Sequence, residues 1–257
     1  MQGLITAAGL GTRANTGINF RKVMLPIYDV RDGKLVIRPL IDCIVERMKR
    51  VSIKDIVVVL DPSDSVTIQY IKSSGIDVSI EYQKERRGFG DAVRAGSKSI
   101  DGRFLLNAGD GILTDITALR KLKESRSGAM LALMKVKNPR KYGIAEYKTS
   151  KNGLYRIIGL EEKPQKPKSN MALAAVYALD KEIIDHIGRD GVNIEFTDAL
   201  RAYMLAGNRI DGILLHNNQW LSVGEVDSYV KVLKATFDWV QHMMHSNPTN
   251  ERLKLTD

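Results

Sequence analysis

The chain has 257 residues, close to the largest size for a single hydrophobic core, and its composition (44% hydrophobic, 6% aromatic) is typical of an aliphatic α/β core. The net charge of +9 comes from basic residues that are spread along the chain rather than gathered in one arm, which argues against a nucleic-acid-binding protein. Binding of small anionic substrates would explain part of this charge. No apolar run approaches the roughly 18 residues of a membrane span, no signal peptide is evident and a single cysteine, Cys43, excludes an internal disulfide, so we expect no membrane partner and a reducing, cytoplasmic location.

Strand-like runs alternate with helical periods in the first half of the chain. The strands are predicted at residues 4–8, 55–60, 78–82, 103–107 and 129–136. Helices are predicted at residues 37–48, where Pro39 lies near the start, around 92–96 and at 116–122. This alternation favours an α/β fold with a mostly parallel, mixed sheet flanked by helices, on which ligands collect at the carboxyl ends of the strands.

The pattern changes from Ile144 onward. Short extended runs are predicted at residues 144–147, 155–158 and 171–179, and a further strand at 210–215. Helices are predicted at residues 181–187, 195–206 and 225–244, followed by a polar tail. No solenoid repeat is found, so we expect one domain over residues 1–257 and no solenoid domain.

The most informative segment is a glycine-rich loop directly after the first strand, Gly9-Leu10-Gly11-Thr12-Arg13. The small residues Ala8, Gly9 and Gly11 let backbone N–H groups approach an anion closely, because no bulky side chain intervenes. Arg13 adds a planar fork of donors and Lys22 a compact positive charge. The dinucleotide and P-loop fingerprints do not fit, because no third glycine and no Gly-Lys-Ser/Thr follow. The segment therefore predicts a polyphosphate site.

Two further motifs follow predicted strands. Gln83 precedes Gly88 by five residues, and its amide offers both a donor and an acceptor. The alternative is an incidental glutamine at a helix entry. Asp110 lies between two glycines after a buried strand, and is either a turn residue or a ligand for Mg²⁺. Residues 84–87 form a charged run that we interpret as a solvated face.

A group of polar motifs lies in the second half. Tyr142-Gly143 is followed by Glu161-Glu162-Lys163-Pro164 and then by the stretch from Asn170 to Tyr177. By itself Glu161-Glu162-Lys163 reads as a charged loop. The last motif is Trp220-Leu221-Ser222-Val223-Gly224.

Taken together, these motifs resemble the sugar nucleotidyltransferases, whose pattern is Gly-x-Gly-Thr-Arg, a loop, Lys-x-x-Leu-Pro, a Gly-Asp element and Glu-Glu-Lys-Pro. The resemblance runs from Met1 to about Leu233. It implies a Rossmann-like nucleotidyltransferase fold of the glycosyltransferase-A type. It also implies transfer of a nucleotidyl group from UTP or dTTP to a sugar 1-phosphate, with glucose 1-phosphate expected first. Residues 1–140 would mainly bind the nucleotide, residues 141–245 the sugar phosphate, and residues 246–257 would form the tail.

The resemblance also implies roles for single residues. It assigns four residues to catalysis: Arg13, Lys22, Asp110 and Lys163. It assigns six to the nucleotide, with a pyrimidine base read by the last two: Ala8, Gly9, Gly11, Thr12, Gln83 and Gly88. It assigns six to the sugar phosphate: Tyr142, Gly143, Glu162, Lys163, Asn170 and Tyr177. Asp110 would hold Mg²⁺, the expected cofactor.

Two positions depart from the family pattern. Ser222 stands where relatives typically carry an aspartate as second metal ligand, and serine binds Mg²⁺ far more weakly. Ala175 stands where relatives usually carry a glycine beside the sugar. A non-catalytic regulatory paralogue that binds a nucleotide sugar therefore stays an alternative. A phosphocholine cytidylyltransferase-like enzyme is a second, although Glu161-Glu162-Lys163-Pro164 argues against it. Whether the chain forms a homo-oligomer is left open.

Overall fold

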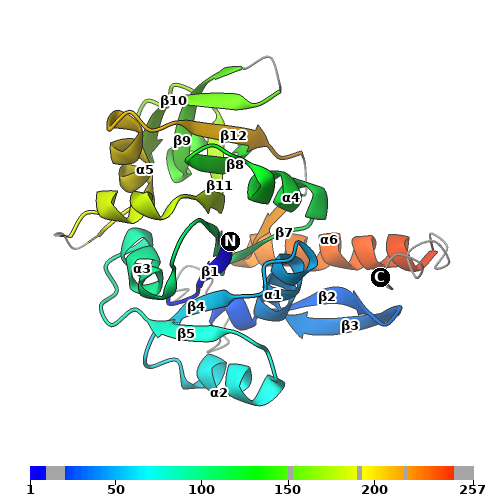
Figure 1. Ribbon diagram of the computed structural model, residues 1–257. Coiled ribbons are helices and arrows are strands. Elements are labelled where there is room, and N and C mark those ends of the chain that lie inside the picture. The colour runs from blue at the N-terminus through cyan, green and yellow to red at the C-terminus, as the bar shows by residue number, and fades with distance from the viewer. Residues whose placement is uncertain (10–20, 150–152, 190–192, 217–218, 246–257) are drawn as a thin grey trace.

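The computed structural model describes residues 1–9, 21–149, 153–189, 193–216 and 219–245. A central sheet is built from nine strands: β1 (Gln2–Thr6), β4 (Ile56–Leu60), β5 (Ser79–Tyr82), β6 (Phe104–Ala108), β8 (Ala129–Lys135), β9 (Gly143–Thr149), β10 (Tyr155–Glu162), β11 (Met171–Leu179) and β12 (Ile210–Leu214). Their order across the sheet is β5-β4-β1-β6-β11-β8-β12-β10-β9 (Figure 1). One sheet therefore runs through both halves of the chain.

The direction of the strands changes across the sheet. The first four strands in this order, β5, β4, β1 and β6, are parallel. β11 runs antiparallel to β6 and β8, and β10 runs antiparallel to β12 and β9. Every residue of β4 and β6 is buried, as expected for parallel strands that are covered on both faces. The predicted mixed sheet flanked by helices is confirmed, and each of its antiparallel pairs includes β10 or β11 from the C-terminal half.

The described residues form six α-helices: α1 (Leu40–Arg50), α2 (Ser65–Ser74), α3 (Phe89–Gly96), α4 (Ile116–Glu124), α5 (Phe196–Leu205) and α6 (Val226–His245). Buried side chains of α1, α2 and α4 join one hydrophobic cluster, and those of α3 and α5 join a second cluster on the other face. The helix boundaries follow local chemistry. The side chain of Asp64 accepts from the backbone N–H of Thr67 at the start of α2, and Gly75 ends it with φ +73°.

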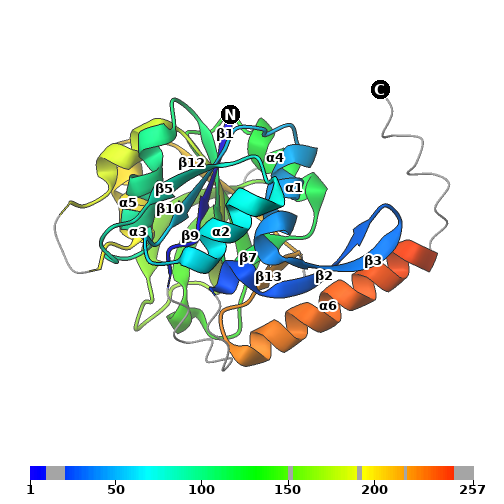
Figure 2. The same ribbon diagram turned by 90° about the horizontal axis from the view of Figure 1, so that it is seen from below.

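Two small two-stranded sheets complete the fold. β2 (Pro26–Arg31) and β3 (Lys34–Pro39) form a hairpin, and β7 (Gly111–Leu113) pairs with β13 (Trp220–Ser222). The hairpin turns at Asp32 and Gly33, both with positive φ (51° and 71°), as an Asp-Gly hairpin turn requires. Helix α6 lies along the hairpin (Figures 1 and 2), where the Tyr229 hydroxyl donates to the Pro26 carbonyl at 2.7 Å.

The structure corrects two predicted elements. The helix predicted at residues 37–48 begins only at Leu40, because Lys34–Pro39 pairs with Pro26–Arg31 as a strand. The helix predicted at residues 181–187 is a short 3-10 helix, Lys181–His186. None of the described helices is both long and apolar enough to cross a membrane.

Candidate active site

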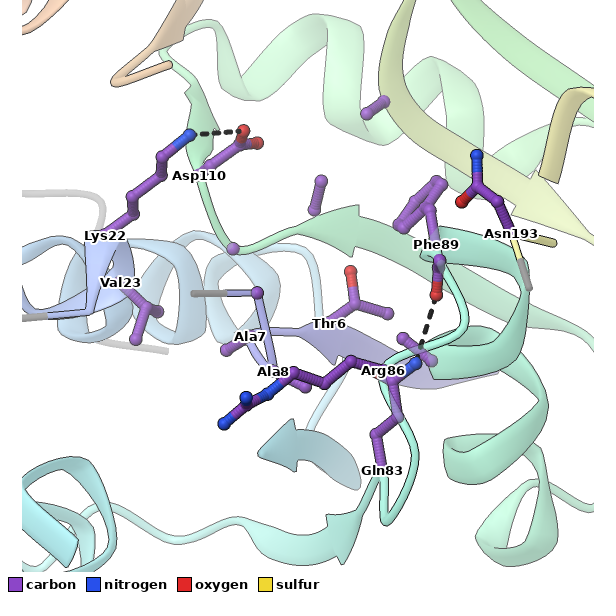
Figure 3. A pocket seen from close by; sticks show the side chains of 16 residues that line it. Thr6, Ala7, Ala8, Lys22, Val23, Gln83, Arg86, Phe89, Asp110 and Asn193 are labelled. Carbon is purple, nitrogen blue, oxygen red and sulfur yellow. Dashed lines mark hydrogen bonds and ion pairs between the residues drawn. The ribbon is translucent and has the colours of Figure 1, made fainter. Parts of the chain in front are cut away.

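A cavity of about 680 Å³ opens at the carboxyl ends of β1 and β6. Its wall is formed by the segment that follows β1, by Lys22 and Val23, by the segment between β5 and α3, and by the turn after β6. Figure 3 shows Lys22 and Asp110 on one side of the cavity, with Gln83, Phe89 and Asn193 across from them. This is the edge at which open α/β sheets bind their ligands.

Six residues that the motifs single out line this one cavity: Ala8, Gly9, Lys22, Gln83, Gly88 and Asp110. They come from four separate segments of the chain, which the parallel pairing of β1 with β4 and β6 brings to one edge. Gly11, Thr12 and Arg13, the remainder of the glycine-rich loop, lie outside the described residues.

Lys22 and Asp110 face each other at the cavity wall. Lys22 Nζ lies 3.7 Å from Asp110 Oδ2, and the lysine side chain is 16% exposed and the aspartate side chain 42% exposed. Gly109 lets the turn come close to β1: its N–H donates to the Thr6 carbonyl at 2.8 Å, and a Cβ at this position would lie 2.8 Å from the same oxygen. The close approach leaves the Asp110 carboxylate on the cavity side.

Ser222 lies directly beside Asp110. In the antiparallel pair of β7 and β13, Ser222 is opposite Gly111, and the N–H of Val223 donates to the Asp110 carbonyl at 2.8 Å. Among the described residues that line the cavity, Asp110 is the one carboxylate. Among all the residues that the structure describes, no group of three or more His, Cys, Asp or Glu side chains could hold a metal ion. Such a donor set suits a hard cation that takes its other oxygens from a bound phosphate and water.

Gln83 and Gly88 form the opposite wall. The Gln83 side chain is buried, and its Nε2 donates to the Gly88 carbonyl at 3.1 Å and to Asp91 Oδ2 at 2.9 Å. Gly88 has φ +96°, and a Cβ there would lie 2.6 Å from Asn193 Oδ1 and 2.8 Å from the Ile194 carbonyl. Only glycine fits this backbone. Gln83 thus follows the end of β5, and Gly88, five residues later, supplies the positive-φ turn that leads into α3.

Arg86 also lines the cavity, although the charged run 84–87 is interpreted from sequence as a solvated face. Its Nε donates to Asp61, which follows β4 and also accepts from the backbone N–H of Ser63 at 2.8 Å. Burial favours a higher pKa for Asp61, but the hydrogen bonds from Arg86 and Ser63 outweigh it and lower the pKa to about 2. The carboxylate is therefore charged and anchors Arg86. Nothing in the sequence links Arg86 to Asp61, since only the pairing of β4 with β5 brings them together.

The sugar-side motifs form a second cluster at the ends of β9 and β10. Gly143 pairs with Glu162 across the two strands, and the N–H of Lys163 donates to the Tyr142 carbonyl at 3.0 Å. Lys163 Nζ lies 2.8 Å from Glu162 Oε1 and 3.1 Å from Glu195 Oε1. Burial favours a lower pKa for Lys163, but these two carboxylates more than offset it and raise the pKa. Lys163 is thus a fixed cation.

The two other predicted sugar residues are placed differently. Tyr177 is buried on β11, with its ring stacked on Phe196 at a centroid distance of 6.1 Å, and burial followed by the charge of Glu162 raises its pKa well above the usual range. Asn170 is exposed, and its carbonyl accepts from the N–H of Val136. Glu162 also accepts from the Thr197 hydroxyl at 2.6 Å, a contact that the motifs do not predict.

Strand β11 connects the cavity with the second cluster. Ala175 lines the cavity, and Tyr177 follows two residues later. Phe89 on the cavity wall packs edge-to-face on Phe196, which in turn stacks on Tyr177. The two clusters are therefore neighbours across a shared aromatic layer.

Comparison with known proteins agrees with this geometry. A family model described as nucleotidyl transferase matches residues 2–238. The chain is 30% identical over 242 residues to the glucose-1-phosphate thymidylyltransferase of Mycolicibacterium smegmatis (89% of this chain, 79% of that protein) and 29% identical over 243 residues to that of Neisseria meningitidis serogroup A (89% and 80%). A structure of UDP-glucose pyrophosphorylase complexed with UDP-glucose matches with a TM-score of 0.76 at 23% identity, over 93% of this chain and 98% of that one. The chain belongs to the nucleotidyl transferase family.

Proposed function

We propose that this protein transfers a nucleotidyl group from UTP or dTTP to a sugar 1-phosphate, with glucose 1-phosphate as the first candidate, and releases pyrophosphate. The observation that carries the proposal is the pair of Lys22 and Asp110, 3.7 Å apart, on a cavity whose opposite wall holds Gln83 and Gly88. The names of the related proteins support the choice of a sugar 1-phosphate and a pyrimidine nucleotide. Residues 1–140 then mainly serve the nucleotide and residues 141–245 the sugar phosphate.

In the proposed reaction, an oxygen of the sugar 1-phosphate attacks the α-phosphorus in line, and the bond to the departing pyrophosphate breaks. The nucleophile is already an anion, so no general base is required. The main barrier is the approach of two anions, which positioned cations lower. Lys22 would bridge the α-phosphate and the nucleophile, and Arg13 would bind the β- and γ-phosphates. Asp110, together with the triphosphate oxygens, would hold Mg²⁺, which neutralises phosphate charge when bound.

Lys163 would receive the incoming sugar phosphate. Glu162 and Glu195 hold its Nζ in the structure, and the third hydrogen of the ammonium group can be donated to the substrate phosphate. Glu162, oriented by the Thr197 hydroxyl, can accept hydrogen bonds from the sugar hydroxyls.

Pyrophosphate release tests the proposal. UTP, dTTP, CTP, ATP and GTP are each combined with glucose 1-phosphate, other hexose 1-phosphates or phosphocholine in the presence of Mg²⁺. We expect release with UTP or dTTP and a hexose 1-phosphate, and none when the acceptor is omitted. Release with CTP and phosphocholine alone would point to a cytidylyltransferase instead.

A regulatory role is the second candidate, and Ser222 beside Asp110 is the observation that favours it. A protein of this kind would bind a nucleotide sugar in the cavity without turnover. Binding of UDP-glucose or dTDP-glucose without pyrophosphate release for any substrate pair would support it over the enzyme.

The dependence on magnesium tests the part that Ser222 plays. With one carboxylate in the site, metal should arrive largely with the triphosphate, and Ser222→Asp should lower the Mg²⁺ concentration that gives half of the maximal rate by roughly several-fold, because a second charged oxygen is added. Ser222→Asn is the matched control, similar in size to aspartate but uncharged, and should not lower it. If Ser222→Asp leaves the metal dependence unchanged, another group completes the site, and Asp227 is the next to test.

A further inference from the structure

We propose that Asp91 is a positioning residue that fixes the orientation of the Gln83 amide and so makes the site prefer uracil or thymine over cytosine. The inference rests on the proposed function, since it concerns the base of the same nucleotide. Asp91 does not line the cavity and acts only through Gln83.

The hydrogen bonds of Gln83 define which end of its amide is available. Both hydrogens of Nε2 are used, one for the Gly88 carbonyl at 3.1 Å and one for Asp91 Oδ2 at 2.9 Å. Both partners are acceptors, so a reversed amide would place Gln83 Oε1 against the Gly88 carbonyl oxygen and Asp91 Oδ2. No N–H or O–H in the part of the chain that the structure describes donates to Gln83 Oε1. The amide therefore offers an acceptor as its remaining group on the cavity wall.

Asp91 is itself held in place as an acceptor. It is 7% exposed, and its Oδ1 accepts from Arg94 Nη2 at 2.6 Å and from Arg87 Nη2 at 3.4 Å. Arg94 is fixed in turn by the carbonyl of Gly188 at 2.7 Å. Asp91 is also in the first turn of α3, where the helix dipole favours a negative charge. Two guanidinium groups and the helix start thus hold the Asp91 carboxylate behind Gln83.

A fixed acceptor discriminates between pyrimidines by the hydrogen on the ring nitrogen. Uracil and thymine carry N3–H and can donate to Gln83 Oε1, whereas cytosine has a lone pair at N3 that would repel it. The N–H of Gly88 has no acceptor within the described residues, so it can donate to a carbonyl oxygen of the same base. The methyl group of thymine does not affect this contact, so the device separates UTP and dTTP from CTP but not from each other.

Asp91→Asn tests the inference, because an asparagine side chain can present a donor to Gln83 and so removes one of the two acceptors that fix the amide, leaving the Gly88 carbonyl alone to orient it. We expect the ratio of kcat/KM for UTP (or dTTP) to that for CTP to fall about tenfold, the scale of one hydrogen bond. The KM for the sugar 1-phosphate should not change. Asp211→Asn is the matched control: Asp211 is a carboxylate 1% exposed that accepts from Arg156 at 2.8 Å and Arg209 at 2.6 Å, and it does not line the cavity. It should leave the ratio unchanged.

A double-mutant cycle shows whether Asp91 acts through Gln83. In a Gln83→Met background the amide is gone, so Asp91→Asn should have no further effect on the ratio. An unchanged ratio in Asp91→Asn alone, or an equal fall in the presence and absence of Gln83, would overturn the proposal. The Kd values of UTP and CTP, measured by calorimetry on the same variants, give the same test without turnover. A protein that releases no pyrophosphate but shows the predicted change in Kd would thus contradict the proposed enzyme and still support the role of Asp91.

Discussion

Lys22→Ala should lower kcat about 10²-fold or more, the scale for the loss of one preorganised group that stabilises charge in the transition state. In the proposed reaction Lys22 bridges the α-phosphate and the nucleophile, so its loss should lower kcat more than it raises the KM for the triphosphate. The fold should be unaffected, because an ion pair at 3.7 Å between partly exposed side chains contributes little to stability, about 1 kcal/mol or less.

The measurement is steady-state pyrophosphate release, accompanied by a thermal unfolding curve for each variant. Lys84→Ala is the matched control: Lys84 is an exposed lysine one residue after Gln83 that does not line the cavity, and its loss should change kcat by less than about twofold. If Lys22→Ala lost no more activity than Lys84→Ala, the phosphates would not be bound at this loop.

The edge of the sheet that carries the cavity is the part of the candidate site that sequence predicts best. Residues that follow parallel strands must meet at one edge, so Ala8, Gly9 and Asp110 could be placed together once the alternation of strands and helices was recognised. The pairing of Ser222 with Gly111 places Ser222 next to Asp110, and its part in metal binding stays a prediction. In both cases a strand end fixes where the side chain lies.

The hairpin of β2 and β3 is the part of the fold that the helical spacing of hydrophobic residues fails to predict. Ile37 and Leu40 fit the spacing of the helix that follows, yet Ile37 belongs to β3 and is 63% exposed. Burial alternates along β3, but Leu35 and Ile37 take exposed positions and Arg38 a partly buried one, so its hydrophobic residues do not follow the burial pattern. The Asp32-Gly33 pair is the local signal that could have identified the turn.

The charged residues of the site are harder to predict, because a buried ion pair looks like surface charge in a sequence. Arg86 lies in the charged run 84–87 and Asp91 follows it four residues later, and each contacts a partner that the sequence does not indicate, Asp61 for the first and Gln83 for the second. The role of Asn170 stays a prediction: its position in the motif suggests a ligand, and in the structure its side chain is exposed while its carbonyl accepts from the N–H of Val136. Only the packing of strands and helices decides which charges face a cavity.

Asp110→Asn should reduce turnover about 10³-fold, the largest loss that we expect from a single substitution, because the amide removes the one carboxylate of the described cavity wall that can bind a hard cation. Asparagine keeps the shape of the side chain and the backbone contacts of Asp110 with Val223, so the fold should persist.

The loss should also depend on the metal, because Asp110 has two roles that compete. In the structure it is the partner of Lys22, and a cation bound by Asp110 would free Lys22 for the phosphates. Asp110→Asn should therefore raise the Mg²⁺ concentration needed for half of the maximal rate, whereas Lys22→Ala should not raise it. Asp101→Asn, an exposed aspartate away from the cavity, serves as the control and should retain full activity. A variant Asp110→Asn that kept more than about a tenth of the native rate at ordinary Mg²⁺ would show that the metal is held elsewhere, because the loss of a true metal ligand costs far more than that.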